Sequence, residues 1–239
     1  MKQIWSKRLN NERGNAAIFM IGILSVMMIM FVFVLNLSKV LAVKEQANTT
    51  AQQASLAATA VLYEQIWDSI DAYEDDLNKK LLEGLDPESE TTISELYPKT
   101  IAERVDEETV KIQSAKPELS QNEARRKAMN QVISDEIKNG KWGDMLRDQL
   151  DDDLRFHIIP AMKAAAKDTI HENNGNTSEA EIRIFEKERI YVKASNNVES
   201  TAYGDYLKGI KKKLFQESAG PKIDFVKFLS IRGTHSLDE

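Results

Sequence analysis

The hydrophobic pattern of this chain begins with a continuous apolar run, Ala16–Leu35. Its twenty residues include no charge and no proline, and Ser25 is their one polar side chain. In a helix, a run of this length spans about 30 Å, which is the thickness of the hydrocarbon core of a bilayer. A helix in the core of a soluble protein would carry a polar face over that length. The run therefore predicts a single N-terminal transmembrane helix over residues 16–35.

An amphipathic pattern follows and predicts that the helix continues over residues 36–83. This stretch contains no glycine and no proline, and small or apolar residues recur in it at steps of three and four. Alanine on such a face lets two helices approach closely. The first part of the face, here named the alanine seam, is a candidate contact for a partner helix: Ala47, Ala51, Ala54, Ala58 and Leu62.

The sequence leaves an alternative open for the alanine seam, which is packing against later helices of the same chain. For the larger residues that continue the face, from Ile66 to Leu81, packing within the chain is favoured. If unbroken, a helix over residues 16–83 would be a rod of about 100 Å, at 1.5 Å per residue.

Residues 84–178 predict a helical body, because helical periodicity alternates there with glycine, proline and asparagine. Residues 84–100 are expected to be a connection, and Ser120 with Glu123 has the spacing of a capping box. We expect helices over residues 100–116, 120–138, 142–156 and 161–170, with Pro160 interrupting or restarting the last, and a turn over residues 172–178.

The apolar period then changes from about 3.6 to 2, which predicts half-buried strands. Ile182 and Ile184 alternate with charged residues, as do Ile190 and Val192, and residues 198–206 are a candidate third strand. Residues 208–215 and 224–229 are ambiguous short elements. We expect residues 179–231 to form a small α+β part and residues 232–239 to be a loose tail. The predicted fold class is mainly α with a small antiparallel β element (α+β).

The charge distribution predicts the orientation of the chain in a membrane. The chain carries a net charge of −6, but residues 1–15 hold an excess of three positive charges. Basic residues before a membrane helix favour a cytoplasmic leader over residues 1–15 and an extracytoplasmic domain over residues 36–239. A signal peptide cleaved after Ala42 is the alternative, although the apolar run is longer than a typical signal sequence. The acidic remainder argues against a nucleic-acid partner.

Candidate chemistry is sparse. The chain has no cysteine, which excludes disulfides and thiolate sites and, for an outer domain, favours a bacterial surface protein. His157, His171 and His235 share no ligand spacing, and Asp151–Asp153 is expected to be a solvated acidic turn. No nucleophile or phosphate-binding motif is present. We therefore expect no enzyme activity, no cofactor and no metal.

Two stretches resemble the TadE/TadG-like family of Flp (Tad) pilus-assembly proteins. They are the Glu-Arg-Gly-Asn-Ala-Ala step at residues 12–17 and the Ala-rich segment Gln46–Ala60. The resemblance covers residues 12–62, and Gln52 replaces the aspartate that is usual in that segment. Pilins of this type carry glutamate five positions beyond the cleaved glycine, and from Gly14 that position is Phe19. The resemblance thus implies an uncleaved, anchored, TadG-like protein.

These observations lead to one functional hypothesis and one alternative. The hypothesis is a non-enzymatic, single-pass protein that assists assembly or anchoring of a Tad-type pilus or a related secretion apparatus. Its expected partners are the lipid bilayer and pilus or secretion components, with a homo-oligomer as a further possibility. The alternative is a ligand-sensing ectodomain, which would need a separate membrane partner because fifteen cytoplasmic residues cannot hold a signalling domain.

Overall fold

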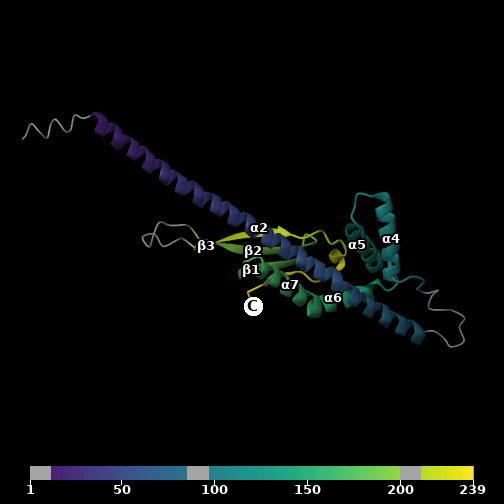
Figure 1. Ribbon diagram of the computed structural model, residues 1–239. Helices are drawn as coiled ribbons and strands as arrows, with labels where there is room; N and C mark the ends of the chain where they lie inside the picture. Colours follow the sequence, from purple (N-terminus) through teal and green to yellow (C-terminus); the bar gives the residue numbers. More distant parts are fainter. Residues whose placement is uncertain (1–11, 85–96, 200–210, 239) are drawn as a thin grey trace, which may run out of the picture. The chain divides into compact units, whose positions relative to one another are not determined.

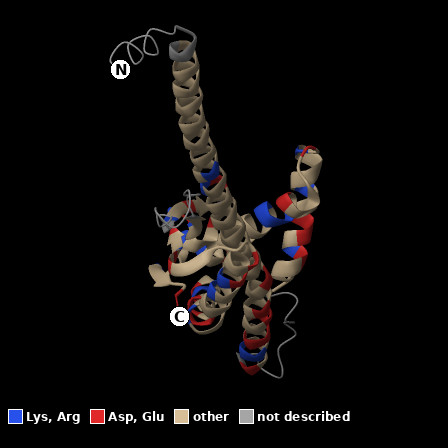
Figure 2. Ribbon diagram, turned by 60° about the vertical axis from the view of Figure 1, so that its left-hand side comes forward, with Lys and Arg blue, Asp and Glu red and all other residues tan. Residues whose placement is uncertain are grey.

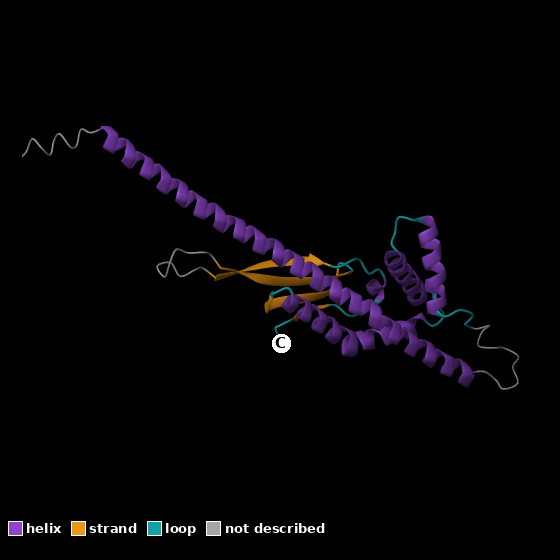
Figure 3. Ribbon diagram, viewed as in Figure 1, coloured by secondary structure: helices purple, strands orange, loops and turns teal. Residues whose placement is uncertain are grey.

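The computed structural model describes residues 12–84, 97–199 and 211–238 (Figure 1). The chain divides into two compact units. The first contains residues 1–46 and 197–214, and the second contains residues 47–196 and 215–239. Helices and strands are both present, with the strands confined to the C-terminal part of the chain (Figure 3). The predicted α+β class is confirmed.

Helix α2 (Glu12–Gly84) confirms the prediction of one continuous helix from the apolar run to residue 83. Its 73 residues contain no proline, and before the terminal Gly84 the glycines are Gly14 and Gly22, both in the first eleven residues of the helix. Glycine weakens a helix and favours its termination, so the end at Gly84 follows from the local sequence. From Ala47 onward, α2 contributes side chains to the core of the second unit.

Three helices follow in the second unit: α4 (Ile101–Ala115), α5 (Gln121–Asn139) and α6 (Gly143–Asp153). The capping box predicted for Ser120 and Glu123 is present at the start of α5. A second capping box, formed by Thr100 and Glu103, begins α4. In both boxes the hydroxyl and the carboxylate satisfy backbone N–H groups that the first turn leaves without partners.

The expected restart of a helix at Pro160 is found there, since α7 begins one residue earlier, but the α-helix before it ends sooner than expected. Helix α6 passes through a π-helical turn, η1 (Leu154–Ile158), directly into α7 (Ile159–Glu172). The wider turn is marked by the N–H of Ile159, which donates to the carbonyl of Leu154 five residues earlier. Pro160 then lies in the first turn of α7, directly after the π-helical turn.

The sheet has four strands in the order β3-β2-β1-β4. They are β1 (Asn176–Glu186), β2 (Arg189–Glu199), β3 (Lys211–Ala219) and β4 (Gly233–Ser236), and a 3₁₀ turn, η3 (Phe225–Phe228), precedes β4. Strand β1 pairs antiparallel with β2 and with β4, so that Ile182 lies opposite both Val192 and His235. The predicted alternation at Ile182, Ile184, Ile190 and Val192 is confirmed, since all four side chains are buried.

Three expectations about the C-terminal part are corrected. Of the tail expected over residues 232–239, the described residues 232–238 are not loose, because β4 pairs with the edge of β1 and Leu237 is 1% exposed. The turn expected over residues 172–178 is shorter, since β1 begins at Asn176. The third strand is β3, whereas Val198 and Glu199 belong to β2 and residues 200–206 lie outside the described residues.

One face of the sheet builds the core of the second unit. Its apolar side chains join one cluster with those of α7 and with residues 51–81 of α2. The other face presents charged and aromatic residues, among which Arg183 lies over the ring of Tyr191 and Lys193 over that of Phe215. Alternation along β1 and β2 separates these two faces.

Candidate functional site

Most apolar side chains of α2 in the first unit are exposed. Ile18 and Phe19 are 72% and 70% exposed, and a Cβ added at Gly22 would meet no atom within 4 Å. Figure 2 shows this stretch without charged residues. The hydroxyl of Ser25 donates to the carbonyl of Ile21 at 2.8 Å, so it is satisfied inside the helix. Such a surface is costly in water and suited to lipid.

The alanine seam lies in the core of the second unit. Ala47, Ala51, Ala54, Ala58 and Leu62 are all fully buried within the chain itself. The structure therefore contains the intramolecular packing that the sequence left open as an alternative. A contact of the same side chains with a partner helix remains a prediction, and it would require the elements that cover the seam to move.

Two glycines allow the chain to approach α2 closely beside the alanine seam. A Cβ at Gly220 would lie 2.5 Å from Oγ1 of Thr59 and 3.2 Å from the carbonyl oxygen of Ser55. A Cβ at Gly175 would lie 3.0 Å from Cγ2 of Thr50. The backbone after β3 and the turn before β1 thus approach α2 too closely for larger side chains. Sequence analysis missed both glycines, because nothing local marks them as packing positions.

Hydroxyl groups of α2 beside the alanine seam are buried as well. Thr59 donates its hydroxyl to the carbonyl of Ser55 at 2.7 Å, and Ser55 donates to Gln52 at 2.8 Å. The hydroxyl of Thr50 is buried and has no hydrogen-bond partner among the described residues, and the same holds for that of Ser195 in β2. Alanine and hydroxyl side chains bury little apolar area, so this half of α2 gains less from packing than the half that carries Ile66, Ile70 and Leu77.

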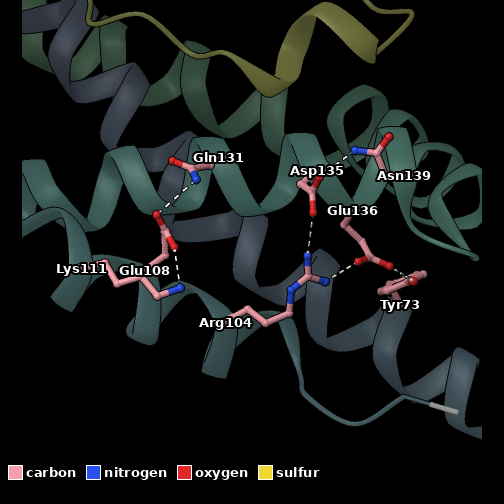
Figure 4. A network of polar contacts seen from close by, with 8 residues as sticks. All are labelled: Tyr73, Arg104, Glu108, Lys111, Gln131, Asp135, Glu136 and Asn139. Atoms are coloured by element: carbon pink, nitrogen blue, oxygen red, sulfur yellow. Dashed lines mark hydrogen bonds and ion pairs between the residues drawn. The ribbon is translucent and has the colours of Figure 1, made fainter.

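A polar network joins the C-terminal part of α2 to α4 and α5 (Figure 4). Glu136 of α5 is 5% exposed, and its carboxylate accepts hydrogen bonds from the hydroxyl of Tyr73 and the guanidinium of Arg104. Arg104 also pairs with Asp135 at 3.4 Å. A buried carboxylate is stable only when it is paired and hydrogen-bonded, and Arg104 and Tyr73 meet that requirement here.

A second contact reinforces the same junction. Glu74 of α2 accepts a hydrogen bond from the N–H of Ile101 at 2.6 Å and one from the hydroxyl of Tyr97 at 3.2 Å. Burial raises the pKa of Glu74 above its ordinary value, although these two hydrogen bonds lower it. Burial and the charge of Glu74 raise the pKa of Tyr97. Burial and the charge of Glu136 likewise raise the pKa of Tyr73.

Further contacts join the middle of α2 to α5 and η3. The amide of Asn130 donates to the hydroxyl of Tyr63 at 2.7 Å and accepts from the N–H of Asp224 at 2.8 Å. The ring of Tyr63 contacts Phe225 edge to face, with centroids 6.4 Å apart. Arg125 lies over the ring of Trp67. In the sequence, Tyr63 and Trp67 lie beside the apolar face of the helix, and nothing there predicts these contacts.

The histidines and the acidic run Asp151–Asp153, considered above as candidate metal ligands, do not come together in one site within the described residues. Asp151 accepts from the N–H of Ser230 at 3.0 Å, whereas Asp153 accepts from Gln149 at 2.9 Å. His157 lies 3.6 Å from Asp153 and is largely exposed, while burial lowers the pKa of His235. Among the described residues, no group of three or more acidic or histidine side chains is placed to hold a metal. This part of the structure assigns no catalytic role to any of them.

These features define a protein in which one helix, long and apolar enough to cross a membrane, continues into a folded α+β unit. Residues 14–61 match the family model described as "Putative Flp pilus-assembly TadE/G-like". The match confirms the resemblance read over residues 12–62 and supports a role related to pilus assembly. Searches of curated proteins and of solved structures found no match to the chain.

Proposed function

We propose that this protein is a membrane-anchored, non-enzymatic component that assists assembly or anchoring of a Tad-type pilus or a related secretion apparatus. The observation that carries the proposal is the extent of the family match. Residues 14–61 include both the exposed apolar stretch of α2 and most of the buried alanine seam. The matched segment thus contains a helix suited to lipid and the part of the same helix that enters a folded core.

The proposed orientation places residues 1–15 in the cytoplasm and residues 36–239 outside it. The basic residues before the apolar run favour this direction of insertion. We propose that the N-terminal segment stays attached, because Ala42 and Val43 lie inside α2. Cleavage after Ala42 would remove the apolar stretch and leave the folded unit without an anchor.

The proposed role is to hold and position partners, and not to polymerise. Phe19 occupies the position at which a pilin of this type carries glutamate, and it is 70% exposed among apolar neighbours. A subunit without that carboxylate has no side chain there to pair with the amino terminus of the next subunit. The contacts of Tyr73 and Glu74 support a stiff junction between α2 and the helices that follow it.

In vivo photo-crosslinking tests the proposed partners. A photoreactive amino acid is introduced at Leu56, which is 46% exposed on α2, and at Ile70, which is fully buried and outside the alanine seam, as a control. We expect a crosslink from position 56 to a component of the pilus or secretion apparatus, identified by mass spectrometry, and none from position 70. A crosslink from position 56 to a sensor protein in place of such a component would contradict the proposal and favour the ligand-sensing alternative.

A further inference from the structure

A groove of about 920 Å³ lies between α4, α5 and η3, away from the alanine seam. Its volume is within the range of about 300–1,000 Å³ that is typical of ligand sites. Four exposed lysine side chains line it: Lys116, Lys127, Lys138 and Lys227. Lys127 and Lys138 are separated by about three helical turns, which places them on the same side of α5.

The carboxylates of the groove do not neutralise these lysines. Asp135 is already engaged by Arg104 at 3.4 Å and by the amide of Asn139 at 2.7 Å. Asp224 pairs with Lys222 at 2.8 Å, outside the groove lining. None of the four lysines forms an ion pair with a carboxylate in the described part of the chain. The groove is therefore a locally positive surface on an acidic protein.

The groove also has an apolar part. Ile112 and Phe228 are partly buried and line it, and Lys227 lies over the ring of Phe228 at 4.9 Å. Ser134 lines the same groove, and its hydroxyl has no hydrogen-bond partner within the described residues. A ligand that fits this lining combines negative charge with apolar groups and hydrogen-bonding capacity.

We propose that this groove binds an acidic, extended peptide segment of a partner protein. Carboxylates of the segment would pair with the lysines at the rim, and its apolar side chains would cover Ile112 and Phe228. A continuous polyanion fits less well, because Asp135 and Asp224 would repel part of its charge, whereas a peptide can place neutral residues beside them. The proposal does not rest on the membrane role or on the pilus assignment.

Peptide binding to the full chain in neutral phosphatidylcholine nanodiscs tests the proposal. The probe is a fluorescein-labelled short peptide of alternating glutamate and leucine, and the control peptide has glutamine in place of every glutamate. We expect fluorescence anisotropy to report binding of the glutamate peptide, weakened by added salt as charged groups are screened. Absence of binding, or equal binding of the glutamine peptide, would overturn the proposal.

Charge reversal locates the site. The double variant Lys127→Glu/Lys138→Glu is expected to weaken binding by about tenfold or more, since it replaces two attractions by repulsions. Lys187→Glu makes one such charge reversal at an exposed position in the turn between β1 and β2, and it is expected to leave binding unchanged. Circular dichroism checks that each variant is folded.

Two outcomes of these experiments would contradict the site. Equal loss of affinity in Lys187→Glu would mean that overall charge is responsible and not the groove. Lysine-dependent binding of a polyphosphate chain without binding of the peptide would assign the groove to a phosphate polymer.

Discussion

The hydroxyl of Tyr73 in α2 donates a 3.4 Å hydrogen bond to Oε1 of Glu136 in α5, 63 residues further along the chain. Arg104 of α4 binds the other oxygen of the same carboxylate. One buried acidic group thus joins three helices that the sequence separates by long intervals. Because the pair is enclosed, removal of either partner leaves a buried polar group without compensation, and that is costly.

Alkaline pH is expected to weaken this junction. Burial and the charge of Glu136 raise the pKa of Tyr73 above its ordinary value of 10.0. Below pH 10 the tyrosine is protonated in both the folded and the unfolded chain, so its contribution to stability is complete. Above that pH the unfolded chain releases the proton first. The free energy of unfolding should then fall by up to about 1.4 kcal/mol per pH unit for this group.

Chemical denaturation as a function of pH measures this effect. Tyr73→Phe should be less stable than the parent at neutral pH and should lose less stability between pH 10 and pH 12. Tyr191→Phe, on the charged face of the sheet, serves as a control for loss of a hydroxyl. An identical alkaline slope in Tyr73→Phe and the parent would show that this tyrosine does not carry the effect.

The alanine seam provides a matched pair of substitutions on one helix. Ala58 is fully buried, whereas Ala60 is exposed two residues further along α2. Ala58→Leu should destabilise the second unit by about 1–3 kcal/mol through overpacking. Ala60→Leu should change stability by no more than about 0.5 kcal/mol. Thermal unfolding of both variants in the same micelles makes the comparison. Equal stability of the two would mean that the seam is not enclosed.

The close approach of Gly220 to Thr59 predicts an interaction between two substitutions. Gly220→Ala places a Cβ 2.5 Å from Oγ1 of Thr59 and should destabilise the fold. Thr59→Ala removes that oxygen, so the double variant should recover part of the loss. We expect a coupling free energy of about 0.5–3 kcal/mol from the double-mutant cycle. Strict additivity would contradict the contact.

The absence of cysteine allows the orientation to be tested by single cysteine substitutions. Ser6→Cys lies in the basic leader, and Ser230→Cys introduces an exposed thiol after η3. In intact cells a membrane-impermeant maleimide should label position 230 and should label position 6 only after lysis. The reverse pattern would mean that the chain is inserted in the opposite direction.

The sequence predicts the long helix well, because the pattern that determines this helix lies within the helix itself. A run without glycine or proline, with a period near 3.6, determines α2 up to Gly84 irrespective of distant contacts. The capping box at Ser120 is equally local, and it is present. Strands β1 and β2 follow from alternation at Ile182, Ile184, Ile190 and Val192.

The features that sequence analysis missed depend on distant partners. Strand β4 carries little apolar alternation, and it forms because β1 offers an open edge. Irregular register near Glu179 and Phe185, both with positive φ, breaks the alternation at the ends of β1. The close packing at Thr50 and Thr59 of α2 depends on Gly175 and Gly220, which lie more than one hundred residues further along the chain.

Restoration of pili in a strain that lacks this gene tests the proposed function most directly. Surface pili are counted by electron microscopy in the deletion strain and after complementation with two forms at equal abundance. One form is the full chain, and in the other a cleavable secretory signal peptide replaces residues 1–42. We expect few or no pili in the deletion strain and recovery only with the full, anchored chain. Normal pili in the deletion strain would contradict the assembly role, and recovery with the released form would contradict the need for an anchor.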